Sequence, residues 1–227
     1  MVIRNTIFVD YKMLNSQGNQ SLESKLEYLL ASGVDEIFVK PVLMTDGFEA
    51  KRLREWLSLY EGRFSKIDFD VPILGNAKAI DKFAEILISE IGFSSEYEYL
   101  LVGHGRKGWS NLEYFQLSDN LHSKGFSNVE VACLVGEGDI NSYLKKIAEK
   151  FSQAGGKKPI QVFPLLINLG VHIQEDIFGT ETDPNGEKSV VQFLEENGYT
   201  VVKNILPLSH FEKFKERYLD EQQKDFL

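Results

Sequence analysis

Apolar and polar positions along this chain alternate between two periods, one typical of buried strands and one typical of amphipathic helices. Short runs rich in Ile, Val, Leu and Phe predict seven strands, at residues 3–9, 36–44, 67–74, 97–102, 129–135, 160–168 and 199–206. Between them, apolar residues recur every three or four positions and predict helices at residues 21–32, 48–61, 77–91, 110–123, 139–154, 187–197 and 209–222, with another helical start within 170–180. Strands that alternate with helices form parallel β/α units, so we predict a three-layer α/β fold in which helices flank the parallel sheets.

Two residues are expected to mark helix ends. Gly33 is the kind of residue that often follows the last turn of a helix, because it has no side chain to oppose a left-handed backbone. Ser209 carries a hydroxyl that can accept a hydrogen bond from an exposed backbone N–H, and we expect it to cap the last helix.

A short repeat relates the two parts of the chain. The strand and loop that begin at Val39 match those that begin at Val162, with a proline, an apolar triplet and a glycine in the same register. The offset is constant at 123 (162 − 39, 164 − 41 and 170 − 47). Chance could match two such strands, but the common register favours duplication. We therefore predict two similar halves, residues 1–93 and 94–227, that face each other across a cleft, with the first half shortened.

Composition limits the class of protein. The 227 residues include 34 Asp and Glu against 25 Lys and Arg, a formal net charge of −9, and the pI is about 5.1. This acidity argues against a nucleic-acid binder, which needs a basic surface to displace the counterions of phosphate. With 43% hydrophobic and 12% aromatic residues, the chain has enough apolar material for a core, which excludes general disorder.

The expected location is the cytoplasm. Cys133 is the only cysteine, which excludes a disulfide framework, and its apolar neighbours predict a buried, inert thiol. Met1 leads directly into the first predicted strand, so we expect no signal peptide. The longest apolar runs are far below the roughly 20 residues that a membrane span needs, so no membrane partner is expected either.

Candidate chemistry lies after the strands. Parallel sheets bind ligands beyond the carboxyl ends of their strands, where loop backbone and helix N-termini converge. Three such ends carry a potential metal ligand close to a glycine, namely His104, Glu137 and His172. Glu49 follows an earlier strand and corresponds to His172 at the offset of 123. Two imidazoles and a carboxylate suit a borderline divalent metal such as Co²⁺, Ni²⁺, Fe²⁺ or Zn²⁺.

A simpler interpretation stays open for each of these histidines, as a loop side chain bonded to a backbone carbonyl. His122, late in a helix, and His210, in the first turn of the last predicted helix, are expected to be surface residues. Glu175 and Asp176 are expected to be solvated charges at a helix start, where the helix dipole favours them.

Several common catalytic motifs are absent from the sequence. It contains no GxxxxGK[ST] phosphate loop and no GxGxxG after the first strand. Neither a GxSxG nucleophile elbow nor an HExxH zinc helix occurs. The sequence therefore argues against the usual nucleotide-binding folds, hydrolases and zinc proteases.

Two segments of the sequence are distinctive enough to indicate a protein family. One is Leu-Val-Gly-His-Gly at residues 101–105, with Tyr114 following, and the other runs from Pro164 to Asp176. Gly-Phe-Glu at 47–49 and Gly-Glu-Gly at 136–138 support them. With these motifs, the chain from about residue 39 to about residue 221 resembles the anaerobic cobalt chelatases (sirohydrochlorin cobaltochelatases) of cobalamin biosynthesis, in the class II tetrapyrrole chelatase superfamily.

The resemblance implies a fold of two flavodoxin-like halves around a tetrapyrrole cleft, with a divalent metal ion as substrate and no organic cofactor. By residue-wise likeness, His104, Glu137 and His172 would bind the metal, and His104, His172 and the acidic Glu49 would be the catalytic residues.

The predicted substrate-binding residues are Arg106, Lys107 and Tyr114. Arg106 and Lys107 follow His104 and could pair with peripheral carboxylates of a sirohydrochlorin-like substrate. The alternative for them is an ordinary solvated basic pair.

The implied activity is insertion of a divalent ion, Co²⁺ first and Ni²⁺ or Fe²⁺ as alternatives, into a sirohydrochlorin-type tetrapyrrole. Two pyrrole N–H protons must leave as the metal enters, and a histidine, which titrates near neutrality, can accept one. A non-catalytic relative that carries or senses metal or tetrapyrrole is the alternative function, and an α/β binding domain with coincidental histidines is a third. The sequence leaves homo-oligomerisation open.

Overall fold

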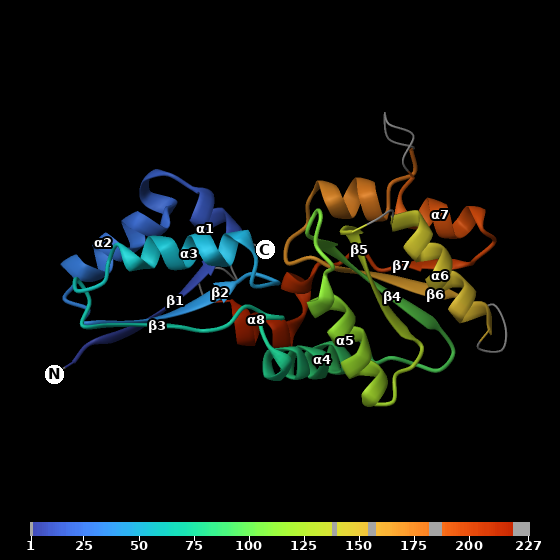
Figure 1. The fold of residues 1–227 in the computed structure, drawn as a ribbon, viewed down its shortest axis with the longest axis horizontal. Coiled ribbons are helices and arrows are strands. Elements are labelled where there is room, and N and C mark those ends of the chain that lie inside the picture. The colour runs from blue at the N-terminus through green and yellow to red at the C-terminus, as the bar shows by residue number, and fades with distance from the viewer. Residues whose placement is uncertain (1, 138–139, 154–157, 182–187, 220–227) are drawn as a thin grey trace. The chain divides into compact units, whose positions relative to one another are not determined.

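The computed structural model describes residues 2–137, 140–153, 158–181 and 188–219 (Figure 1). It is an α/β protein with two parallel sheets flanked by helices, as the sequence predicts. The chain forms two compact units, one up to Phe83 together with the C-terminal segment from Glu216, and one from Ala84 to Lys215. The boundary thus falls within helix α4 (Ala77–Ile91), whereas the predicted halves meet after residue 93.

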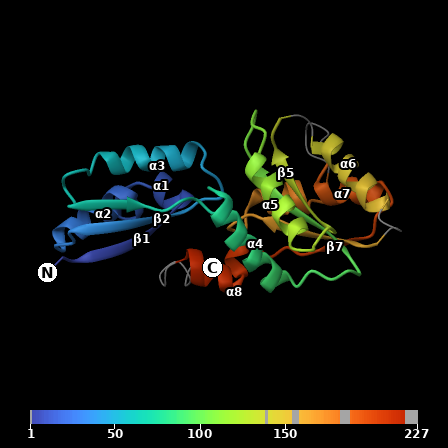
Figure 2. The same ribbon diagram turned by 60° about the horizontal axis from the view of Figure 1, so that its bottom comes forward.

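The first unit contains a three-stranded parallel sheet in the order β1-β2-β3. Its core joins apolar residues of β1 and β2, such as Ile7 and Val39, to the inner faces of α1, α2 and α3, which lie on the same side of the sheet (Figures 1 and 2). The elements that precede α4 are β1 (Arg4–Asp10), α1 (Tyr11–Asn15), the 3₁₀-helix η1 (Gly18–Gln20), α2 (Leu22–Ala31), β2 (Glu36–Val42), α3 (Phe48–Ser58) and β3 (Lys66–Phe69).

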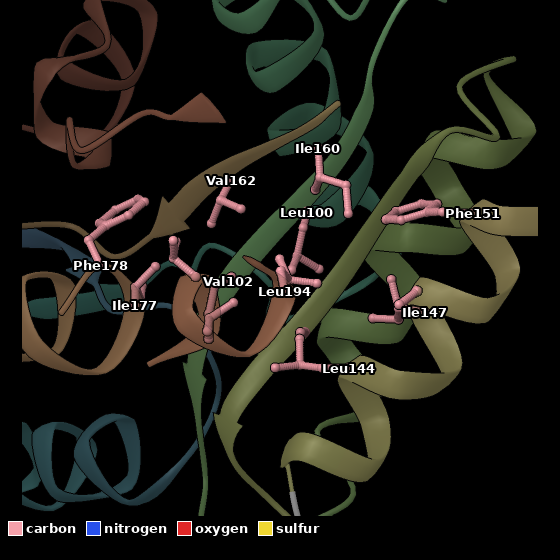
Figure 3. Close-up of a cluster of buried hydrophobic side chains, with 14 of the residues drawn as sticks. Leu100, Val102, Leu144, Ile147, Phe151, Ile160, Val162, Ile177, Phe178 and Leu194 are labelled. Carbon is pink, nitrogen blue, oxygen red and sulfur yellow. The ribbon is translucent and has the colours of Figure 1, made fainter. Parts of the chain in front are cut away.

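The second unit contains a four-stranded parallel sheet in the order β5-β4-β6-β7. Figure 3 shows its core, in which Leu100, Val102 and Val162 of the sheet meet Leu144 of α6 and Leu194 of α7. Its elements after α4 are β4 (Glu98–Gly105), α5 (Leu112–Ser123), β5 (Val129–Val135), α6 (Ile140–Gln153), β6 (Ile160–Leu165), the π-helix η2 (His172–Ile177), α7 (Val190–Glu196), β7 (Val201–Lys203), the 3₁₀-helix η3 (Leu208–His210) and α8 (Glu212–Tyr218), which crosses into the first unit.

The three strands of the first sheet correspond to three of the four strands of the second. In one, Pro41 of β2 pairs with Val9 of β1, and in the other, Pro164 of β6 pairs with Val102 of β4. The prolines are 123 residues apart, the offset of the sequence repeat. The second unit adds α5, β5 and α6 between β4 and β6, whereas the described chain between β1 and β2 contains only α1, η1 and α2. The first sheet is therefore one strand smaller at the β1 edge.

Several element ends differ from the predicted ones. Strand β3 ends at Phe69, before Pro72, which has no N–H to donate to a neighbouring strand. Ser209 does not cap the last helix, because it lies buried within η3 and α8 begins at Glu212. The predicted helix ends at residues 139, 154, 187 and 222 lie outside the described residues. Within the described ranges, no helix has both the length and the apolar character needed to cross a bilayer.

Candidate metal-binding site

The end of β4 directs His104 toward the face of the sheet that α6, α7 and η2 cover. Side chains alternate along a strand, and Leu100 and Val102 lie in the core on this face. His104 is two residues further along, so it continues the same row at the point where the apolar core ends. It is half-buried, in contrast to the buried residues that precede it.

The two glycines around His104 lie on the opposite face and are packed too closely for a side chain. A Cβ on Gly103 would lie 2.3 Å from Cε1 of the Tyr114 ring. Gly105 has a φ of +76°, and a Cβ there would lie 2.1 Å from the carbonyl oxygen of Val135. The Gly-His-Gly sequence therefore allows α5 and the end of β5 to approach the strand closely, which holds the backbone on both sides of His104.

His172 meets His104 at this edge of the sheet. Strand β6 lies beside β4, with Gly103 opposite Leu165, so their carboxyl ends lie next to each other. The loop after β6 leads into η2, whose first residue is His172. The two imidazole rings contact each other edge to face, with centroids 4.5 Å apart and an interplanar angle of 68°. The structure thus brings together two of the three predicted metal ligands.

Hydrogen bonds fix which nitrogen of each ring carries the proton. Nδ1 of His104 lies 2.9 Å from the carbonyl oxygen of Gly105, which can only accept, so Nδ1 donates. Nδ1 of His172 lies 2.5 Å from Oδ2 of Asp176, so a neutral His172 donates to this carboxylate in the same way. In neutral imidazole the other nitrogen then carries a lone pair. Both rings therefore offer Nε2 to a metal ion or a proton.

A cavity of about 650 Å³ lies beside the two histidines within the second unit. Its apolar wall comes from the end of β5, α6 and the start of α7. Its polar wall comes from η2 and the chain that follows, where Gln174, Glu175, Asp176 and Glu181 contribute. The histidines thus lie between an apolar wall, which lowers the local dielectric constant, and carboxylates, which attract cations.

Glu137, the third predicted ligand, lies on the other side of β4. It follows β5, which pairs with the β4 edge opposite to β6. Its side chain is exposed, and its backbone N–H donates to the carbonyl of Trp109 at 3.0 Å. Across the described ranges, no three or more His, Cys, Asp or Glu side chains are grouped closely enough to hold a metal ion. The structure therefore pairs the histidines but does not bring Glu137 to them.

The predicted substrate-binding residues have different surroundings. Arg106 forms an ion pair with Glu113 at 2.6 Å, and its guanidinium lies 4.7 Å from the centroid of the Trp109 ring. Lys107 is exposed. Tyr114 is only 2% exposed beneath Gly103, and burial raises the pKa of its hydroxyl. Lys107 is therefore the member of this set whose charge faces solvent, whereas Arg106 and Tyr114 contribute to the packing around His104.

Glu49 belongs to the first unit. It is the second residue of α3 and follows β2, as His172 follows β6 in the other sheet. It is half-buried. A carboxylate in the first turn of a helix is favoured by the positive end of the helix dipole. The structure therefore places Glu49 and His172 after corresponding strands of the two sheets.

Two residues that sequence reasoning did not assign shape this site. Asp176 is exposed, as expected of a solvated charge, and it also accepts the hydrogen bond of His172. The spacing of four residues was the available signal, because it places two side chains on one helical face. Asn111 has a φ of 52° and ties the loop after His104 to the end of β5 through hydrogen bonds with Arg106 and Val135.

Three other expectations have clear outcomes. His122 is not a surface residue: it is half-buried, and Nε2 lies 2.7 Å from the carbonyl oxygen of Val129. His210 is exposed, as predicted. Cys133 is half-buried, and burial raises the pKa of its thiol to about 12, so it is protonated and unreactive at neutral pH.

Comparison with known proteins identifies the family. The model of the cobalt chelatase (CbiK) family matches residues 10–225, nearly the whole chain. The chain belongs to the cobalt chelatase family. This membership makes it a metal chelatase of the tetrapyrrole type, with a metal ion as its substrate. No curated protein sequence matches the chain.

A solved structure supports the fold. SirB from Bacillus subtilis, solved with Fe³⁺, superposes on this chelatase with a TM-score of 0.58 and 17% sequence identity. The match covers 88% of this chain and 75% of SirB. At this level of identity the likeness concerns the arrangement of helices and strands, so the two chains share a fold.

Proposed function

We propose that this chelatase inserts Co²⁺ into a sirohydrochlorin-type tetrapyrrole in cobalamin biosynthesis. The observation that carries the proposal is the pair formed by His104 and His172, whose rings lie 4.5 Å apart and whose Nδ1 atoms are both engaged. Two Nε2 lone pairs at one sheet edge form a site for a borderline divalent ion, which imidazole nitrogen suits.

Release of the metal is as important as its capture, because the ion is a substrate. Two imidazoles leave most coordination positions to water or to the incoming macrocycle, and they bind less tightly than a closed set of cysteines. We propose that Glu137, which lies apart from the pair in this structure, completes the metal site when the ion is bound, and that Glu49 is a second acidic group that takes part in catalysis. The likeness of the surrounding motifs to those of the family supports both assignments.

Two pyrrole protons must leave the macrocycle as the metal enters. Once the metal passes from a histidine to the macrocycle, the lone pair on Nε2 of that histidine becomes free and can accept a proton, and histidine titrates close to neutral pH. We assign this role to His104 and His172. The carboxylate of Asp176 can stabilise the positive charge that His172 acquires, because it already accepts the hydrogen bond from Nδ1.

Substrate carboxylates need a cation at the rim of the site. Lys107 is exposed two residues after Gly105, so we propose that it pairs with a peripheral carboxylate of the macrocycle. We also propose Arg106 and Tyr114 as substrate-binding residues. The ion pair of Arg106 with Glu113 and the burial of Tyr114 favour an indirect contribution, in which both hold the loop that presents Lys107.

We further propose that the reaction needs no organic cofactor and takes place in the cytoplasm. The single cysteine fits a reducing compartment. Ni²⁺ and Fe²⁺ suit the same ligands and are the alternative metals.

The test is insertion of Co²⁺ into sirohydrochlorin, followed by the shift in visible absorption as the metal enters the ring. His104→Ala and His172→Ala should each reduce the rate by about 100-fold or more, as expected for a group that acts in proton transfer. His210→Ala is the matched control, because it truncates an exposed histidine outside the site and should leave the rate unchanged. Wild-type rates in both site variants would refute the proposal.

One observation favours a second function, a carrier or sensor of metal or tetrapyrrole. Over the described residues, the first unit has no strand in the position that β5 occupies in the second unit. A smaller first sheet reduces the surface that can hold the macrocycle. This alternative predicts binding of Co²⁺ or tetrapyrrole to the wild-type protein without any turnover.

A further inference from the structure

The two histidines of the site are held by different kinds of partner. His104 donates to the backbone carbonyl of its neighbour Gly105, a group that no substitution removes. His172 donates to the side chain of Asp176, four residues later in η2. The conformation of His172 is therefore the one that a side chain controls.

The π-helix η2, which carries both His172 and Asp176, favours the contact between them. Residues 172–177 form a π-helix, in which the N–H of Phe178 donates to the carbonyl of Ile173 at 3.1 Å. Gly179 lets the turn end tightly, because a Cβ there would lie 2.3 Å from the carbonyl oxygen of Glu175. Ile173 and Ile177 are buried in the core, which fixes the rotation of η2 and leaves His172 and Asp176 together on its outer face.

From this geometry we infer that Asp176 is a positioning residue for His172, which holds the proton of the neutral ring on Nδ1 and directs the lone pair of Nε2 toward the metal. A carboxylate is a better acceptor than water, so it favours the tautomer that donates to it. Its negative charge also raises the electron-donating strength of Nε2. One consequence, that metal affinity depends on Asp176, rests on the proposed function. The position of the proton on His172 does not.

Asp176 is well suited to a substitution test. Its side chain is 46% exposed, so truncation removes a hydrogen bond without opening a cavity in the core. Glu175 is the matched control, because it is an adjacent exposed carboxylate at the same cavity and, within the described residues, it forms no hydrogen bond or ion pair with a histidine. Asp176→Ala and Glu175→Ala make the same change in charge, and only the first removes the contact with His172.

The first measurement concerns the metal-free protein. Nitrogen-15 NMR of the histidine rings at about pH 8, above the ordinary histidine pKa of about 6.5, distinguishes a protonated ring nitrogen from one with a lone pair. We expect His172 to carry its proton on Nδ1 in the wild type and in Glu175→Ala. In Asp176→Ala, we expect a mixture of the two tautomers. An unchanged His172 tautomer in Asp176→Ala would overturn the inference.

The second measurement is titration with Co²⁺, followed by its visible absorption bands. Asp176→Ala should weaken binding by about 10- to 100-fold, the range found when a partner of a metal-bound histidine is removed. Glu175→Ala should weaken it by less than about threefold, because an exposed charge is screened. Asp176→Glu should restore part of the affinity. Equal effects of the two alanine variants would mean that charge alone matters, and would overturn the inference.

Two other outcomes separate the explanations. If Asp176→Ala shifts the absorption bands of bound Co²⁺ while the ring tautomer stays unchanged, Asp176 is itself a metal ligand and the positioning role is wrong. If the wild type binds no Co²⁺ but the tautomer depends on Asp176, the positioning role is supported and the proposed function fails.

Discussion

Asn111 ties the loop that follows His104 to the end of strand β5. Its replacement by alanine tests how firmly that loop is held. The residue is 3% exposed. Its Oδ1 accepts from the N–H of Arg106 at 2.8 Å, and its Nδ2 donates to the carbonyl of Val135 at 2.7 Å. Its φ of 52° is left-handed, a conformation that asparagine adopts more readily than alanine.

The magnitude follows from these contacts. Asn111→Ala leaves two partly buried backbone groups without their partners, at about 1 kcal/mol each. Alanine with a positive φ adds about 1 kcal/mol. We therefore expect the free energy of unfolding to fall by about 3 kcal/mol, a large share of the about 5–15 kcal/mol that stabilises a typical protein. The loop beside His104 loosens at the same time, so the affinity for Co²⁺ should also fall.

Equilibrium unfolding in urea, followed by circular dichroism, measures this change. Asn111→Gly is the matched control, because it loses the same hydrogen bonds but adopts a positive φ freely, so it should be about 1 kcal/mol more stable than the alanine variant. A loss of less than about 1 kcal/mol in Asn111→Ala would refute the role of the two hydrogen bonds. Equal stability of the two variants would refute the conformational part of the reasoning.

Two further predictions concern the same unit. Gly103→Ala should lower the free energy of unfolding by about 1–3 kcal/mol, because the new Cβ would lie 2.3 Å from Cε1 of the buried Tyr114 ring; an unchanged urea midpoint would contradict this close approach. Burial raises the pKa of Glu98 above its ordinary value of 4.5, so the stability that this carboxyl contributes is fully present below pH 4.5 and is lost as the pH rises through the raised pKa. Thermal unfolding should therefore show Glu98→Gln becoming more stable relative to the wild type as the pH rises from about 4 to about 7. Parallel curves of stability against pH for the two proteins would show that the carboxyl titrates normally.

Local patterns were sufficient for the longer elements. Helix α4 covers residues 77–91 and strand β5 covers residues 129–135, as predicted, because their apolar spacing is regular over their whole length. The parallel α/β architecture follows from the same alternation of strands and helices. The sequence also placed glycines on both sides of His104, and in the structure a Cβ on Gly103 or Gly105 would overlap neighbouring atoms.

Shorter elements depended on single contacts that the pattern does not reveal. Helix α1 has only five residues, too few for a period, and it begins where Oδ1 of Asp10 accepts from the N–H of Met13 at 2.7 Å. Ser209 has the residue type of a helix cap, but its burial within η3 moves the start of α8 to Glu212. His122 is half-buried because the end of α5 packs against the start of β5.

The sequence by itself determined which residue types follow each strand, and hence that imidazoles and carboxylates end up at the carboxyl edge of a parallel sheet. It did not determine which of them meet. That depends on the order of strands, in which β4 lies between β5 and β6, so that His172 reaches His104 from one side and Glu137 follows the strand on the other. Strand order is decided by backbone pairing and core packing between segments far apart in the chain, and a local pattern carries no information about such pairing.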